Sequence, residues 1–132
     1  MERNVGDSIR LMVPATSAAV RIARAGAAAL ATQAGFSYRE GEELRLAVGE
    51  AAALLAPEPD GDGTLVIVYD VEDEALRVDL HLTDRRAESG PADVPPVAAA
   101  VLDASVDTWR LSDHGRRIVL RKEVHPDDTD DD

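Results

Sequence analysis

The sequence predicts an α+β fold, a two-layer sandwich in which one antiparallel or mixed sheet carries three helices on one face. Three observations predict it. The expected elements follow the order strand, helix, helix, strand, strand, loop, helix, strand, strand. Short turns join the consecutive strands, as in antiparallel hairpins. One strand alternates apolar and polar residues, so the second face of the sheet is expected to stay partly exposed.

The first strand is expected at residues 8–15. Within it Ile9, Leu11 and Val13 alternate with residues of a second face, and Pro14 then ends the strand. Alternation of this kind is typical of a strand that buries one face. We therefore expect the three aliphatic side chains to pack against the core.

An Ala-rich helix is expected over residues 16–34. Thr16 is expected to cap its first turn, and Gly35 follows its last residue, where a left-handed conformation is common. This helix contains Arg21 and Arg24 and no acidic residue. A basic helix on an acidic protein is either a docking face for a partner or a pair of arginines on a solvated surface.

A second helix is expected from Ser37 to Ala56. Ser37 and Glu40 have the spacing of a capping box, in which the Ser hydroxyl accepts from the N3 amide and the Glu carboxylate accepts from the cap amide. Pro57 closes the helix. Local sequence therefore defines both of its ends.

The second helix carries one lone carboxylate, Glu50, in an apolar stretch. The positions three and four residues away from it are all apolar: Leu46, Ala47, Ala53 and Leu54. Two readings follow from this pattern. Either the helix is covered on two sides and Glu50 lies at a rim, reaching water or an arginine, or the carboxylate is there for a function.

The middle of the chain is expected to form two strands and a loop. Residues 64–71 are apolar on both faces, which is typical of a strand inside a sheet. Residues 76–83 alternate, so their apolar side chains are expected to face the core and their polar ones to face solvent. Residues 84–96 contain almost nothing that could enter a core and are expected to form a loop.

The last elements are expected to be a short helix over residues 97–105 and a β-hairpin. The hairpin strands are residues 106–111 and 116–124. Gly115 suits the left-handed position of the turn between them. This hairpin completes the antiparallel or mixed sheet.

Composition limits the possible function classes. The formal net charge of −12 argues against a direct nucleic-acid partner, because phosphate binding depends on Lys and Arg. With 45% hydrophobic and 3% aromatic residues, the core is expected to consist of Ala, Val and Leu. Residues 1–125 are expected to form one domain and the acidic residues 126–132 a disordered tail. The lack of cysteine and of a membrane span predicts a soluble cytoplasmic protein without a membrane partner.

Catalytic motifs are scarce when judged by residue type alone. His81, His114 and His125 are expected on a strand face, in a turn and in the tail, so their spacing predicts no metal site. Each of them is expected to be solvated. The sequence contains no Walker A loop, no Rossmann glycine fingerprint and no nucleophile elbow. Glu50 remains the unusual residue.

The order of elements and the run LRLAVGEAAALL resemble the GHKL, or Bergerat-fold, ATPase superfamily. The closer resemblance is to the small anti-sigma factor and switch-protein serine kinases of Gram-positive bacteria, and it spans residues 8–124. In that family the second helix reads approximately LRLAVDEACTNA. The resemblance implies that Glu50 corresponds to the general base, and that the family's Mg²⁺-ligating Asn corresponds to residue 54.

The sequence departs from the family pattern at three places. Leu54 stands at the Asn position, and an aliphatic side chain cannot coordinate Mg²⁺. Asp84 matches the Asp that holds the adenine amino group, but both glycines of the Asp-x-Gly-x-Gly motif are missing. The residues that follow it are Arg85, Arg86, Ala87 and Glu88. The Gly-rich lid is replaced by a segment with Pro95 and Pro96, whose φ is fixed.

The resemblance implies a regulator that works through surfaces more than through chemistry. On this hypothesis the protein controls transcription by binding a sigma factor or its antagonist, with no cofactor or only weakly bound ATP and Mg²⁺. The alternative is an active ATP-dependent serine/threonine kinase that phosphorylates an antagonist protein. A third option is a degenerate member with another protein partner. The family geometry implies that Arg21 and Arg24 face the partner, and that their helix also meets a second copy in a homodimer.

Overall fold

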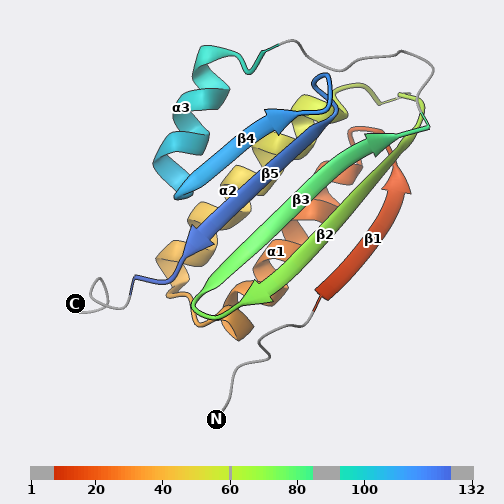
Figure 1. Ribbon diagram of the computed structural model, residues 1–132. Helices are drawn as coiled ribbons and strands as arrows, with labels where there is room; N and C mark the ends of the chain where they lie inside the picture. Colours follow the sequence, from red (N-terminus) through yellow and green to blue (C-terminus); the bar gives the residue numbers. More distant parts are fainter. Residues whose placement is uncertain (1–7, 60, 85–92, 126–132) are drawn as a thin grey trace.

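The computed structural model describes residues 8–59, 61–84 and 93–125 (Figure 1). Their order of elements is the predicted one. The described elements are β1 (Ser8–Pro14), α1 (Ala19–Ala34), α2 (Tyr38–Leu55), β2 (Thr64–Glu72), β3 (Ala75–Thr83), α3 (Pro96–Ser105), β4 (Thr108–Ser112) and β5 (Arg117–Glu123). The predicted tail, residues 126–132, lies outside the described residues.

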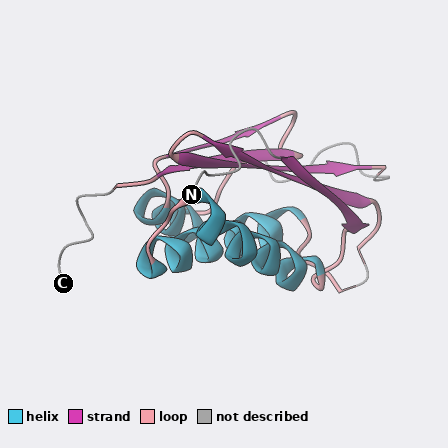
Figure 2. Cartoon of the chain, turned by 90° about the horizontal axis from the view of Figure 1, so that it is seen from below, coloured by secondary structure: helices cyan, strands magenta, loops and turns pink. Residues whose placement is uncertain are grey.

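The strands form one antiparallel sheet in the order β1-β2-β3-β5-β4. β5 therefore lies between β3 and β4, although it follows both of them in the sequence. Seen along the sheet, the helices α1, α2 and α3 all lie on one face (Figure 2). This arrangement confirms the predicted two-layer α+β fold, and the sheet is antiparallel throughout the described strands.

The core lies between the helices and the inner face of the sheet, and it is built mainly from Ala, Val and Leu, as composition predicts. The aromatic residue of this buried cluster is Tyr69 of β2. Its hydroxyl donates a hydrogen bond to the carbonyl of Ala23 in α1 over 2.8 Å, and burial raises the pKa of Tyr69. Gly26 leaves room for the ring, because a Cβ at that position would meet the Tyr69 side chain. α1 is thereby held close to the sheet.

Two predicted helix-end signals are confirmed and one is wrong. Ser37 Oγ accepts from the Glu40 amide over 3.1 Å, and the Ser37 amide donates to Glu40 Oε1 over 2.9 Å, which is the predicted capping box. Gly35 ends α1 with a φ of 92°. Thr16 does not cap α1, because its carbonyl accepts from Ala19 in a tight turn that precedes the helix.

β1 is an edge strand and is buried less than its alternation predicts. Leu11 and Val13 are partly buried against the core, as expected, but Ile9 is 42% exposed. An edge strand has a neighbour on one side only, so side chains near its end are incompletely covered. β2, by contrast, is paired on both sides, which confirms its prediction as an interior strand.

The histidines, all predicted to be solvated, differ in their surroundings. His81 Nε2 lies 2.8 Å from Asp113 Oδ2, and this hydrogen bond lowers the pKa of Asp113. The His125 ring lies 3.1 Å from Asp107 Oδ2. Only His114 has a side chain that is mostly exposed, at 81%. The prediction of solvation is therefore confirmed for His114 and for His125, which is 46% exposed. It is wrong for His81, which is half-buried and whose carboxylate partner comes from another part of the chain.

Candidate functional site

α2 presents one line of side chains toward solvent. With about 3.6 residues per turn, helical spacing places these residues in line: Arg39, Glu43, Leu46, Glu50 and Leu54. Leu46 is 48% exposed, and both Glu50 and Leu54 are half-buried. Glu50 therefore lies between two leucines at the edge of the exposed face of α2. The opposite face of the helix packs in the core.

The Glu50 carboxylate differs from the other carboxylates of α2 in its contacts. No hydrogen bond or ion pair joins it to another residue in the part of the chain that the structure describes. Leu54, one turn later, packs against the hydrophobic core. Glu50 thus has no structural partner among the described residues, and its aliphatic neighbour contributes to packing.

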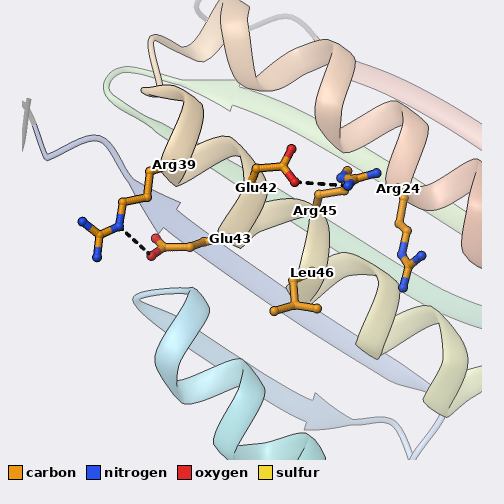
Figure 3. Close-up of a pocket in the computed structure, with 6 residues that line it drawn as sticks. All are labelled: Arg24, Arg39, Glu42, Glu43, Arg45 and Leu46. Carbon is orange, nitrogen blue, oxygen red and sulfur yellow. Dashed lines mark hydrogen bonds and ion pairs between the residues drawn. The ribbon is translucent and has the colours of Figure 1, made fainter.

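A surface groove of about 410 Å³ begins one turn before Glu50 on the same helix (Figure 3). We call it the arginine groove. It is lined by Arg24 of α1 and by five residues of α2: Arg39, Glu42, Glu43, Arg45 and Leu46. Arg45 donates to Glu42 over 3.1 Å, and Arg39 lies 3.8 Å from Glu43. The groove therefore combines charged walls with one exposed leucine.

Glu43 has a second and closer partner in the sheet. Lys122 of β5 points inward, and its Nζ donates to Glu43 Oε1 over 2.9 Å and to the Ser105 carbonyl at the end of α3 over 2.7 Å. The Lys122 side chain is only 5% exposed. One buried cation therefore joins α2, α3 and β5. Because Lys122 already balances Glu43, the exposed Arg39 is only loosely held.

Arg24 lies against α2 at Gly49. A Cβ at residue 49 would meet the Arg24 side chain, so the absence of a side chain there makes room for the arginine. The family pattern has Asp at this position. Arg24 therefore lies beside the residue that precedes Glu50, whereas Arg21 is exposed farther along α1 and does not line the groove.

The C-terminal end of α2, the helix that carries Glu50, and the end of β3, which Asp84 follows, lie toward the same end of the molecule (Figure 1). The chain leaves α2 after Leu55 and re-enters the sheet at Thr64, which pairs with Thr83 at the end of β3. Asp84 follows directly, is exposed and has a φ of 58°. The topology thus brings the two acidic residues that the family resemblance singles out to one end of the sandwich.

The predicted cleft between Glu50 and the loop 84–96 falls largely on residues 85–92, outside the described residues. Arg85, Arg86, Ala87 and Glu88 belong to that range. The cleft therefore stays a prediction. The end of the loop is described, and α3 begins at Pro96 instead of at residue 97. Proline suits the first helical position, because the amide that it lacks would have no partner there.

No group of three or more His, Asp or Glu side chains that could hold a metal ion exists within residues 8–59, 61–84 and 93–125. None of the helices described is long and apolar enough to cross a bilayer.

Sequence reasoning missed Lys122 and the arginine groove. One signal for Lys122 was present, because it occupies the next inward position of β5 after Ile118 and Leu120, where an apolar residue is expected. A lysine at such a position indicates a buried partner. The groove had no comparable signal, since its lining combines residues from two helices.

Comparison with curated proteins gives related sequences. Over 98 residues the chain is 33% identical to the serine-protein kinase RsbW of Listeria monocytogenes serovar 1/2a and 32% identical to the protein of the same name in Listeria innocua serovar 6a. The aligned region covers 67% of this chain and 62% of each relative, so the chain spans less than two thirds of their length. No protein-family model matches the chain.

Proposed function

Because the chain belongs to the family of anti-sigma factors and switch-protein serine kinases within the GHKL superfamily, we propose that it regulates transcription by binding a sigma factor or its antagonist. It does so through its protein surfaces. Its ATP site is eroded, so nucleotide and Mg²⁺ bind weakly or not at all. The names of the Listeria relatives, serine-protein kinases, support the family origin of this site.

The observation that carries this proposal is Leu54. It stands one turn after Glu50, where the family pattern has an Mg²⁺-ligating Asn, and its side chain packs against the core. Mg²⁺ needs oxygen ligands, and phosphoryl transfer depends on positioning and on neutralisation of charge by the metal. The described residues around Glu50 do not fit a Mg-nucleotide. We therefore expect catalysis to be lost more completely than binding.

α1 is the surface proposed to meet the partner. Arg21 and Arg24 are exposed on it, Ile22 is 40% exposed, and the helix has no acidic residue. Such a face suits an acidic patch on a sigma factor, because complementary charge speeds encounter and fixes orientation. The Ala-rich remainder of α1 permits close packing against a second copy, which is the basis for proposing a homodimer.

Titration calorimetry with ATP and Mg²⁺ tests the eroded site. We expect little or no heat of binding for the unmodified protein, and stronger binding for Leu54→Asn, which restores an oxygen ligand. Glu50→Ala serves as a second variant. Micromolar binding that survives Glu50→Ala and is abolished by Asp84→Ala would show an intact nucleotide site and would contradict the proposal.

The alternative function is an active serine/threonine kinase. Glu50 favours this alternative, because its carboxylate matches the family's general base and forms no hydrogen bond or ion pair with a described residue. Incubation with ATP and with a purified candidate antagonist protein separates the two functions. A phosphorylated serine on the antagonist would establish the kinase, and its absence in the presence of a stable complex supports the binding function.

The partner surface is tested by titrating a purified candidate sigma factor against charge-reversal variants. We expect Arg21→Glu and Arg24→Glu to weaken the complex, since each removes an attraction and adds a repulsion. Arg110→Glu, on the exposed side of β4, is the matched control. Equal losses in all three variants would indicate a general effect of net charge and would remove α1 as the interface.

A further inference from the structure

The described chain ends beside the first turn of α2. The His125 amide donates to Glu40 Oε2 over 3.0 Å, and Glu40 is only 5% exposed. The His125 ring is in turn held by Asp107. The last described residue, His125, is therefore held at the first turn of α2, which also carries Arg39 of the arginine groove (Figure 3).

The arginine groove carries positive charge that its own acids do not balance. Arg39 is 87% exposed and lies 3.8 Å from Glu43, whose carboxylate Lys122 holds more closely over 2.9 Å. Arg24 forms no ion pair with any residue that the structure describes. The N-terminus of α2 adds the positive end of a helix dipole on the same side. Two guanidinium groups thus remain for an anionic ligand.

Two partly exposed arginines of β5 already have carboxylate partners. On the outer face of the sheet, Arg117 makes a bidentate pair with Asp79 over 3.0 and 2.9 Å. Arg121 lies between Glu72 and Glu123. An acidic ligand gains less at those positions, because it would have to compete with a carboxylate that is held in place.

Residues 126–132 have the composition and the length to reach the groove. They read PDDTDDD, with five aspartates and no cation. Arg24 lies over Gly49, roughly two and a half turns or about 14 Å along α2 from Glu40. Seven extended residues span up to about 23 Å. The acidic segment is therefore long enough to follow α2 from Arg39 to Arg24.

We propose that residues 126–132 dock along the arginine groove of the same molecule, with their aspartates on Arg39 and Arg24. An acidic partner that approaches this face must displace them, so the segment acts as a built-in competitor. This docking needs no nucleotide and no sigma factor, and it stands or falls independently of the proposed function. Since it is electrostatic and exposed, it weakens as salt screens the charges.

A nitroxide spin label at residue 129 tests the docking in the full chain. The sequence has no cysteine, so Thr129→Cys gives a single labelling position. We expect the label to broaden the NMR signals of Arg39, Arg45 and Leu46 at low salt. The broadening should disappear near 1 M salt, where the Debye length is about 3 Å. It should also be lost in Arg24→Gln/Arg39→Gln and kept in the control Arg110→Gln.

Three outcomes would overturn the proposal. Broadening confined to residues adjacent to 125, or equal on the outer face of the sheet, would show that the groove is not the docking site. Broadening in a mixture of labelled unenriched protein and unlabelled ¹⁵N-enriched protein would assign the groove to the segment of a second copy. Broadening that persists when the five aspartates are changed to asparagine would remove the electrostatic basis.

Discussion

The two halves of α2 use their carboxylates in different ways. In the first half, Glu40 accepts from the Ser37 and His125 amides, and Glu43 is held by the buried Lys122. In the second half, Glu50 is half-exposed and bonded to no described residue. Both halves belong to one continuous helix with the same backbone hydrogen bonds. Helix formation therefore does not explain Glu50.

Structural carboxylates of α2 differ from functional ones in whether their removal leaves hydrogen-bond donors of the protein without an acceptor. Removal of Glu40 or Glu43 leaves donors in the protein without an acceptor, and each such donor lowers the stability by its desolvation free energy. Removal of Glu50 leaves no donor among the described residues without an acceptor. Stability measurements on α2 should therefore rank these residues by their internal partners.

Lys122→Ala should give the largest effect. It leaves Glu43 and the Ser105 carbonyl without their shared donor and opens a space between α2, α3 and β5. We expect a loss of about 2 kcal/mol in the free energy of unfolding, measured by urea denaturation. Lys122→Met keeps the hydrocarbon stem and is the control for packing. If Lys122→Met is as stable as the unmodified protein, the polar contacts of Lys122 do not hold the helices.

Ser37→Ala should cost about 1 kcal/mol, because it removes the hydroxyl that accepts from the Glu40 amide. Ser37→Asp retains an acceptor at the cap and should keep most of the stability. Thermal unfolding followed by circular dichroism measures both variants. Equal stability of Ser37→Ala and the unmodified protein would mean that the first turn of α2 is held by its tertiary contacts alone.

The half-buried pair of His81 and Asp113 should contribute less to stability than either of these sites. Its hydrogen bond lowers the pKa of Asp113 from the ordinary value of 3.8, so its contribution is present above that pH and is lost as pH falls through the lowered pKa. Asp113→Asn should therefore lower the urea midpoint slightly at pH 6, and the difference should vanish in strong acid. If Asp113→Asn lowered the urea midpoint more in acid than at pH 6, Asp113 would not have a lowered pKa in the folded protein.

Glu50→Gln should change the free energy of unfolding least, by no more than about 0.5 kcal/mol in either direction. The side chain lies at a rim, and no described residue depends on it. The same urea titrations, run beside Glu40→Gln as the buried counterpart, give the comparison directly. A loss at Glu50 as large as the loss at Glu40 would make Glu50 a structural residue and end the contrast between the two halves.

Local sequence was sufficient for most of the fold. The capping box at Ser37 and the left-handed Gly115 each depend on neighbours within a few residues, and each is confirmed. The alternation of β3 is confirmed except at Asp79, whose polar side chain is buried and paired with Arg117. The prediction of Thr16 as the helix cap was wrong, because an Ala-rich helix can begin at any of several neighbouring residues. The structure starts α1 at Ala19 with no side-chain cap.

The site was only partly predictable. Glu50 and its leucine neighbours follow from helical spacing, and the family resemblance supplied Asp84. The contacts that define the arginine groove join residues far apart in the sequence, such as Lys122 with Glu43 or Arg24 with Gly49. No local pattern encodes such pairs, because they exist only once the helices have packed on the sheet.

The position of β5 in the sheet has a consequence for how the protein is made. β5 lies between β3 and β4, yet residues 117–123 are translated after both of them. Until they emerge from the ribosome, one edge of β3 has no strand to pair with, and an open edge is a template for joining other chains. A chain interrupted before residue 117 therefore keeps its helices and its first hairpin but exposes an unpaired edge, and we expect such fragments to aggregate.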